Sequence, residues 1–277
     1  MADFQFRQEK LRKIVNNAQW DKETRDFIIR QAAGILINLG MGLRGATELL
    51  RKWTSQDISD LTEYEALAHQ YLRSNTTVCA ELPDRMLERA KAWIDRIGSY
   101  VLPDVSTLDL GGGSGEVANI LRSDSNFSSE ISIADPLDYR RYKDIPYRPI
   151  QGSVIDAADG EFEQTIILTV WHHTDEVEQL VSESFRVTRK RVIVIESTTE
   201  NLMMYRYGCW IDWFYNHILQ YNPDIEKKVN VPCNLKSSDE WERIIWKLTG
   251  LTPMVSKNLG IYQWLNPENH HLFVYEK

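Results

Sequence analysis

A glycine-rich turn near residue 110 is the part of the chain whose residue types and spacing point most directly to chemistry. The turn reads Gly111-Gly112-Gly113-Ser114-Gly115, with the apolar segment 105–110 before it and the segment 116–122 after it. This order predicts a buried strand, a tight turn and the start of a helix. Glycine lets a backbone turn sharply and approach a ligand closely, and the amides at a helix start attract an anionic group. The segment therefore predicts a nucleotide-binding turn.

The spacing of the glycines distinguishes between two cofactor-binding motifs. The dinucleotide fingerprint G-x-G-x-x-G would need a third glycine at the position of Glu116, so an NAD dehydrogenase is disfavoured. The pattern Asp109-x-Gly111-x-Gly113-x-Gly115 instead resembles motif I of the class I S-adenosylmethionine (SAM)-dependent methyltransferases. The resemblance covers residues 100–277, and it implies that the turn holds the amino-acid end of SAM.

The ends of the later strands supply further candidate cofactor contacts. Asp135 ends the predicted strand 130–134, 24 residues after Gly111, and its carboxylate can accept hydrogen bonds from both ribose hydroxyls. The alternative is a loop aspartate that caps residues 139–142. The family often has Gly-Asp after the third strand, with the aspartate accepting from the adenine amino group, whereas this chain has Ser153 there, and Asp156 nearby as a second option. The resemblance implies this cofactor-binding set: Asp109, Gly111, Gly112, Gly113, Gly115, Asp135, Pro136, Ser153, Val154 and Thr169.

Two histidines and a glutamate follow the next two strands. The predicted strand 164–170 leads into Trp171-His172-His173, and Glu196 ends the strand after it. A neutral histidine at a strand end can take a proton from a substrate hydroxyl or amine near pH 7. The resemblance implies that His173, with His172 as second choice, and Glu196 are the catalytic groups. The alternatives are a histidine that caps the following helix and a solvated loop acid.

Residues 197–232 form an insertion that is too aromatic for a solvent-exposed loop. Trp210, Trp213, Phe214 and His217 recur at spacings of three and four, which places them on one helical face. One interpretation is a core face against the sheet. The other is a substrate lid, because an insertion after the fifth strand lies where methyltransferases build one. The predicted substrate-pocket residues are Trp171, Tyr205, Trp213, Asn216 and His217.

Composition restricts the partners. The net charge of -8 gives no basic surface for nucleic acid or an anionic membrane, so we expect a small-molecule substrate. The three cysteines are far apart and form no C-x-x-C pair, which argues against a zinc site or a disulfide framework, and no metal site is predicted. The N-terminal residues lack the apolar core of a signal peptide, and no apolar run is long enough to span a bilayer. We therefore expect a cytoplasmic protein, and the oligomeric state is left open, a homodimer included.

The chain is expected to have two domains. Residues 1–98 contain only helical patterns, with helices predicted at 21–39, 47–53, 58–72 and 83–97, and form an all-helical cap or substrate lid. Residues 99–277 alternate strands and helices and form a SAM-binding α/β domain that carries the aromatic insertion. The fold class is a doubly wound seven-stranded α/β sheet whose last strand is antiparallel, as in class I methyltransferases.

These observations predict a SAM-dependent methyltransferase that acts on a small molecule, with O-, N- or C-methylation in specialised biosynthesis. Two alternatives stay open. One is an enzyme that uses the same site for intramolecular cyclisation of SAM to a small-ring amino acid. The other is a non-catalytic SAM-binding protein, since an intact glycine turn argues for binding but not for catalysis.

Overall fold

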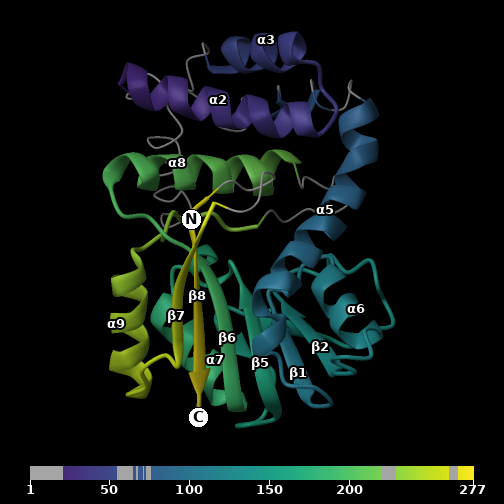
Figure 1. The fold of residues 1–277 in the computed structure, drawn as a ribbon, viewed down its shortest axis with the longest axis vertical. Coiled ribbons are helices and arrows are strands. Elements are labelled where there is room, and N and C mark those ends of the chain that lie inside the picture. The colour runs from purple at the N-terminus through teal and green to yellow at the C-terminus, as the bar shows by residue number, and fades with distance from the viewer. Residues whose placement is uncertain are drawn as a thin grey trace. The chain divides into compact units, whose positions relative to one another are not determined.

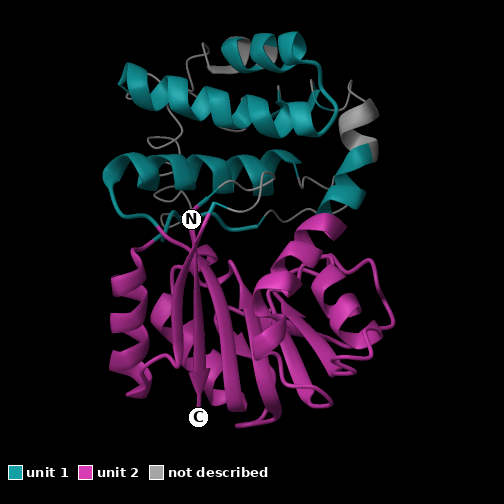
Figure 2. Ribbon diagram, in the orientation of Figure 1, with its two compact units in different colours: residues 1–86, 199–235, 261–268 teal, residues 87–198, 236–260, 269–277 magenta. Residues whose placement is uncertain are grey.

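The computed structural model describes residues 21–54, 65–66, 68–70, 72, 76–219, 229–261 and 268–277. Two compact units share the chain (Figure 2). Unit 1 contains residues 1–86, 199–235 and 261–268, and unit 2 contains residues 87–198, 236–260 and 269–277. Among the described helices, none is both long enough and apolar enough to cross a membrane. The roles of cap and lid that we predicted for 1–98 and 197–232 stay predictions.

Unit 2 is built on one eight-stranded sheet in the order β4-β3-β2-β1-β5-β6-β8-β7 (Figure 1). Strands β3, β2, β1, β5 and β6 run parallel, and β8 pairs antiparallel with both β6 and β7. This confirms the predicted doubly wound sheet with a reversed last strand, but the sheet has eight strands and not the predicted seven, because the short strand β4 is added at one edge. The strands are β1 (Ser106–Leu110), β2 (Glu130–Asp135), β3 (Tyr147–Gln151), β4 (Val154–Ile155), β5 (Phe162–Leu168), β6 (Thr188–Ser197), β7 (Val255–Gly260) and β8 (His270–Glu276).

The central strands are apolar because helices cover both faces of the sheet. Ile166 and Ile167 of β5 and residues 192–195 of β6 are fully buried, as expected for parallel strands with helices on either side. In Figure 1, α6 lies in front of the sheet and α7 lies behind it. The helices of unit 2 are the end of α5 (Thr76–Ile97), α6 (Glu116–Ser123), α7 (Val177–Arg186) and α9 (Ser238–Thr249), with short 3₁₀ turns η2 (Gly98–Tyr100) and η3 (Trp171–His173).

Local signals define the ends of α9. The Ser237 hydroxyl accepts a hydrogen bond from the Glu240 amide, and the Glu240 carboxylate accepts one from the Ser237 amide, which is a capping box. The helix ends at Gly250, whose φ of 70° is a left-handed conformation that glycine adopts without strain. Trp241 on its inner face is fully buried, so this helix is fixed at both ends and along one side.

The order of the strands defines where a ligand can enter unit 2. From β1 the chain moves outward through β2 to β3, and it then returns to place β5 on the other side of β1. The connections on the two sides of this point leave the sheet in opposite directions, and open α/β sheets bind ligands at the carboxyl ends of the strands there, which are β1 and β5 in this protein. The glycine turn follows β1, and the two histidines follow β5.

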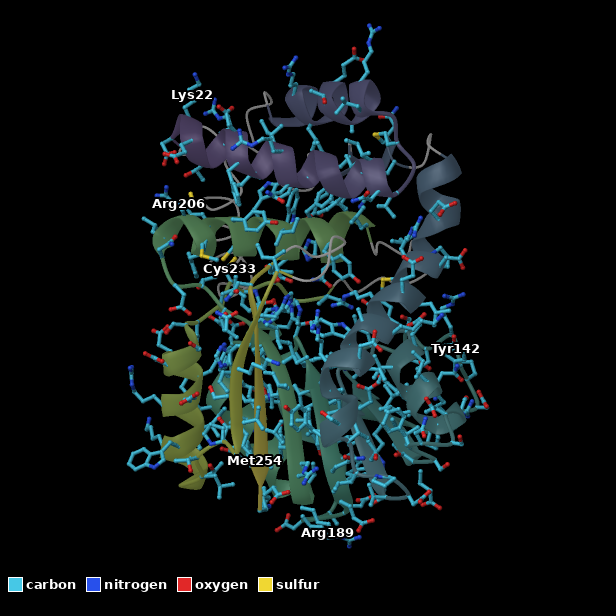
Figure 3. All side chains as sticks on the ribbon, in the orientation of Figure 1. Lys22, Tyr142, Arg189, Arg206, Cys233 and Met254 are labelled. Atoms are coloured by element: carbon cyan, nitrogen blue, oxygen red, sulfur yellow. The ribbon has the colours of Figure 1, made fainter. Side chains whose placement is uncertain are left out.

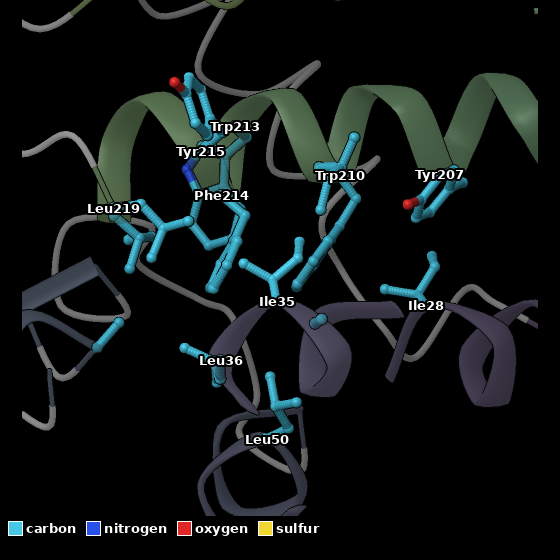
Figure 4. Close-up of a cluster of buried hydrophobic side chains, with 14 of the residues drawn as sticks. Ile28, Ile35, Leu36, Leu50, Tyr207, Trp210, Trp213, Phe214, Tyr215 and Leu219 are labelled. Carbon is cyan, nitrogen blue, oxygen red and sulfur yellow. The ribbon is translucent and has the colours of Figure 1, made fainter. Parts of the chain in front are cut away.

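Unit 1 is helical in its described parts. Its core joins α2 (Lys22–Asn38) to α8 (Leu202–Trp213), with Ile28 and Ile35 of α2 facing Tyr207 and Trp210 of α8 (Figure 4). The chain continues from α8 directly into a π-helix, η4 (Phe214–Leu219). The remaining described helical parts are α3 (Leu43–Thr54), residues 65–72 with gaps, and the first part of α5.

One predicted helix start is wrong. Helix α5 begins at Thr76, so Pro83 lies in its interior and does not open it. Proline removes one N–H donor from the helix, but Leu82 and Met86 pack against the core of unit 1 on either side of it. The predicted helix 58–72 lies mostly outside the described residues.

Candidate cofactor site

The glycine turn has a left-handed backbone at three positions, a conformation that glycine adopts without strain. Gly111 has a φ of 70°, and Gly113 and Gly115 also have positive φ values. A Cβ on Gly111 would lie 2.4 Å from Cγ2 of Val170, so the turn contacts the end of β5 directly. Beside Gly113 the nearest atom to such a Cβ would be the Gly111 carbonyl oxygen at 4.0 Å, so this side of the turn is open. The backbone of the turn is therefore accessible at Gly113 and closely packed at Gly111.

Asp109 lies directly beneath the turn. Its side chain is 2% exposed, and its Oδ2 atom has no hydrogen-bond partner among the described residues. A Cβ on Gly112 would lie 2.7 Å from that oxygen, so the glycine is needed for this close approach. Burial, and after it the neighbouring carboxylate of Asp135, raises the pKa of Asp109 to about 7. A buried carboxylate with an unused oxygen is ready to accept a hydrogen bond from a ligand.

Asp135, at the end of β2, joins the glycine turn to the loop that follows. Its Oδ2 accepts from the Gly113 amide at 3.2 Å and its Oδ1 accepts from the Leu137 amide at 3.0 Å. Burial raises its pKa to about 6, although these two amides act in the opposite direction. The carboxylate also contributes to raising the pKa of Tyr139 to about 12, after burial of that ring. The structure thus places Asp135 beside the turn, as the ribose prediction requires, and it also caps its own loop.

The loop after β2 returns to the start of α6. The Arg141 amide donates to the Ser114 carbonyl at 3.0 Å, and its guanidinium contacts Glu116 at 3.2 Å. The ring of Tyr142, labelled in Figure 3, lies close to Gly115, since a Cβ on that glycine would be 3.4 Å from the ring. These contacts stabilise the end of the turn at residues 114–116, where α6 begins.

The remaining residues of the predicted cofactor-binding set lie on several different segments and not on the glycine turn itself. Ser153 is buried, and its hydroxyl is hydrogen-bonded to that of Thr174 at 3.0 Å. Val154 begins the short strand β4 and is 48% exposed, and Pro136 is exposed as well. Adenine binding by these residues stays a prediction. Thr169 is strained, with a φ of 60°, and its amide donates to the Ile195 carbonyl at 2.7 Å.

Glu196 is not a solvated loop acid. It lies inside β6, pairs in register with His271 of β8, and is fully buried. Its Oε2 contacts Nδ1 of His172 at 2.6 Å, and its Oε1 accepts from the backbone amides of Val170 and Trp171. One carboxylate therefore fixes both the ring of His172 and the backbone that carries it, at the carboxyl end of β5.

The two histidines differ in what holds them. His172 is 2% exposed, and a ring that donates from Nδ1 to a carboxylate carries its lone pair on Nε2. His173 is half-buried, and the two ring centroids lie 4.2 Å apart. We preferred His173 at the sequence level, but it is His172 that contacts the carboxylate that we expected to be its partner.

The prediction that Trp171 lines a substrate pocket needs correction. Its indole is fully buried, its Nε1 donates to the Ser184 hydroxyl at 3.1 Å, and its ring packs on Trp241 of α9. The side chain points into the core between the sheet, α7 and α9. An apolar residue directly after a strand can turn back into the core in this way, and its sequence position alone does not show which way it turns.

Unit 1 contains the other four predicted pocket residues, and most of them have internal partners. Trp213 and His217 both contact Oε1 of Glu65, at 2.8 and 2.7 Å, and Nε2 of His217 lies 2.9 Å from the Val229 carbonyl. The Tyr205 hydroxyl donates to the Cys233 carbonyl, and the Asn216 amide donates to Asp212. Sequence analysis missed Glu65, because an acidic residue in a helical pattern reads as solvent-exposed unless its partners are known.

Comparisons with known proteins add structural similarity only. No protein-family model matches the sequence, and no curated protein matches it. Among solved structures, the chain is similar to a SAM-dependent methyltransferase from Methanosarcina mazei, with 13% identity, 65% of this chain and 96% of that chain covered, and a TM-score of 0.48. A protein from Bacillus halodurans named as a putative methyltransferase gives 12% identity, coverage of 67% and 97%, and a TM-score of 0.47. The [4+2]-cyclase SpnF gives 8% identity, coverage of 67% and 80%, and a TM-score of 0.47.

Proposed function

We propose that this protein is a SAM-dependent methyltransferase that acts on a small molecule. The observation that carries the proposal is the arrangement around the glycine turn at the carboxyl end of β1. An open position at Gly113 lies beside two carboxylates, one of which, Asp109, has a buried oxygen with no partner in the described part of the chain. A ligand with an ammonium group and vicinal hydroxyls would match this set of acceptors.

SAM fits these residues, and when bound it supplies an electrophilic methyl carbon on a sulfonium. The carboxylate of Asp109 would accept from the α-ammonium group, and that of Asp135 would accept from the ribose hydroxyls. These assignments explain why two raised pKa values occur in one place, since perturbed carboxylates often mark a binding site.

His172 is our candidate for the group that takes the proton from the acceptor. Its contact with Glu196 keeps Nδ1–H as the donor and leaves Nε2 as the basic nitrogen. The same carboxylate binds the amides of residues 170 and 171, so the ring is held in a fixed position at the end of β5. His173 is the alternative, because it is adjacent and less buried. The net charge of -8 favours a small acceptor over nucleic acid.

The test is turnover in the presence of SAM. Mass spectrometry of small molecules that copurify with the protein would select acceptors to assay with the wild-type protein, His172→Ala and His173→Ala. A positioned base is worth roughly 10²–10⁴ in rate, so we expect His172→Ala to lose about that much while affinity for S-adenosylhomocysteine changes little. If this loss occurs in His173→Ala and not in His172→Ala, then His173 is the group that takes the proton.

Two results would contradict the proposed reaction. Release of a cyclised amino acid and methylthioadenosine from SAM alone would show the cyclase alternative. Strong methyl incorporation into bulk tRNA, abolished by Gly113→Val, would show that the acceptor is not a small molecule.

A further inference from the structure

Glu116, the first residue of α6, brings a third carboxylate to the glycine turn, and the proposed function has not used it. Its side chain is 5% exposed. The Ser114 hydroxyl donates to its Oε2 atom, and the Arg141 guanidinium donates to its Oε1 atom at 3.2 Å. Its negative charge also contributes to raising the pKa of Asp109, after burial and the carboxylate of Asp135. Glu116 is therefore close enough to Asp109 for its charge to affect that carboxylate.

The backbone amides of the glycine turn donate to acceptors within the protein. The amides of Gly111 and Gly115 donate to backbone carbonyls at 2.7 and 2.9 Å, and the amide of Gly113 donates to Asp135 at 3.2 Å. A glycine turn that binds phosphate instead directs its amides at the ligand. This turn therefore keeps the glycine conformation of an anion-binding turn, but its three positive-φ glycines have their donors already in use.

The start of α6 is also occupied by negative charge. The first turn of a helix attracts anions through its amides and its dipole. Here the Ala118 amide interacts with the carboxylate of Asp109 and opposes the rise in its pKa, and Glu116 adds a second carboxylate on the same turn of the helix. The guanidinium of Arg141, beside this end of the helix, contacts Glu116. The group that could pair with a phosphate here is thus paired with a carboxylate of the protein.

We propose that Glu116 is a specificity-determining residue that excludes ligands with a 5′-phosphate from the cofactor site. The proposal rests on the proposed function, because it takes the ribose of the ligand to lie at Asp135. A group attached to the 5′ carbon then extends over the turn toward the start of α6. An ammonium group meets opposite charge there. A phosphate meets like charge, and the amides of the three glycines are already donating within the protein.

A purely structural role for Glu116 leads to a different expectation. A carboxylate in the first turn stabilises a helix through its dipole, and the bonds from Ser114 and Arg141 would fix the end of the turn. Loss of such a role would weaken binding of every ligand at the turn, with or without a phosphate. Exclusion instead predicts a gain in affinity that is confined to ligands with a phosphate. Glu116→Gln separates the two roles, because it removes the charge and keeps the shape of the side chain.

The experiment is calorimetry with adenosine and ADP, two ligands that differ only in the diphosphate, and with S-adenosylhomocysteine. Glu116→Gln should bind ADP about tenfold or more tightly than the wild-type protein does, because a like charge is removed and Arg141 is released to a phosphate. Its affinity for adenosine should be unchanged. Glu116→Gly, which completes the G-x-G-x-x-G spacing from Gly111, should also gain affinity for ADP. The matched control is Glu130→Gln, which removes an exposed carboxylate at the other end of β2 and should affect none of the ligands.

Three outcomes would contradict the role of Glu116 or the function on which it rests. Affinity for ADP that is unchanged in both Glu116 variants would overturn the role. An equal gain in Glu130→Gln would also overturn it, because only the net charge of the protein would then matter. A wild-type protein that does not bind S-adenosylhomocysteine, with the gain for ADP still present in Glu116→Gln, would reject the proposed function and leave the exclusion of phosphate by Glu116 supported.

Discussion

At the scale of residues, the carboxylates under the glycine turn should make the stability of the protein depend on pH. The folded-state pKa of Asp109 is raised from 3.8 to about 7, so its contribution to stability is fully present below pH 4 and is lost as the pH rises toward 8. We expect the free energy of unfolding of the wild-type protein to fall over this range. In Asp109→Asn this decrease should be smaller by on the order of 2–4 kcal/mol. Urea unfolding of both proteins at pH 4, 6 and 8 would measure this, and parallel curves would contradict it.

Ligand affinity should change in the opposite sense. Ionised Asp109 and Asp135 bind an ammonium group and ribose hydroxyls better than protonated ones, so binding of S-adenosylhomocysteine should strengthen as the pH rises from 5 to 8. Binding near pH 6 should also release protons, which titrations in buffers of different ionisation enthalpy detect. Proton uptake, or affinity independent of pH, would mean that these carboxylates do not face the ligand.

Residue types and spacing could predict where the cofactor residues lie but not how the catalytic ones are held. Asp109, Asp135 and the glycines were identified because a short motif on one turn places them. Trp171 was misassigned to a substrate pocket, and solvent exposure was left open for Glu196, because a side chain that ends or follows a strand can face either solvent or core. Only the partners of Glu196, three groups on the end of β5, reveal that it is buried.

At the scale of elements, the contact between Glu65 and the end of α8 should be a main support of unit 1. Glu65 is buried and contacts Trp213 and His217, which lie on either side of the change from α-helix to π-helix. We expect Glu65→Ala to lower the free energy of unfolding by about 3 kcal/mol, because two buried polar groups lose their acceptor. Urea unfolding followed by tryptophan fluorescence would measure it.

The matched control for this prediction is Glu48→Ala. Glu48 forms an exposed pair with Arg44 on α3, with a side chain that is 64% exposed, so its removal should cost less than about 0.5 kcal/mol. An equal effect of the two substitutions would show that the Glu65 contacts add nothing beyond a surface pair.

Helices and strands could be predicted where the hydrophobic pattern of the sequence is strong. They were harder to predict where tertiary contacts determine the local structure. Strands β1, β2, β5 and β6 were anticipated because each is an apolar run bounded by a turn. Strand β4 was missed, since it has two residues and pairs only with the end of β3. The π-helix at Phe214 keeps the apolar composition of a normal helix, so no sequence period distinguishes it.

At the scale of the whole molecule, the strand order could be expected from the alternation of strands and helices together with the reversed final pair. The sequence could not predict which segments make up unit 1, because this unit combines three separated stretches of the chain. Which stretches associate depends on long-range contacts such as those of α2 with α8, and a local pattern does not contain them.

Binding of S-adenosylhomocysteine tests the central claim most directly. Calorimetry should show one site in the wild-type protein and binding at least about tenfold weaker, or 1.4 kcal/mol, in Gly113→Val. The reason is that valine would occupy the open side of the turn at a φ of 54°, a conformation that is strained for a β-branched residue. Circular dichroism would establish that both proteins are folded. Absence of binding by the wild-type protein, or equal affinity in the folded variant, would contradict the account.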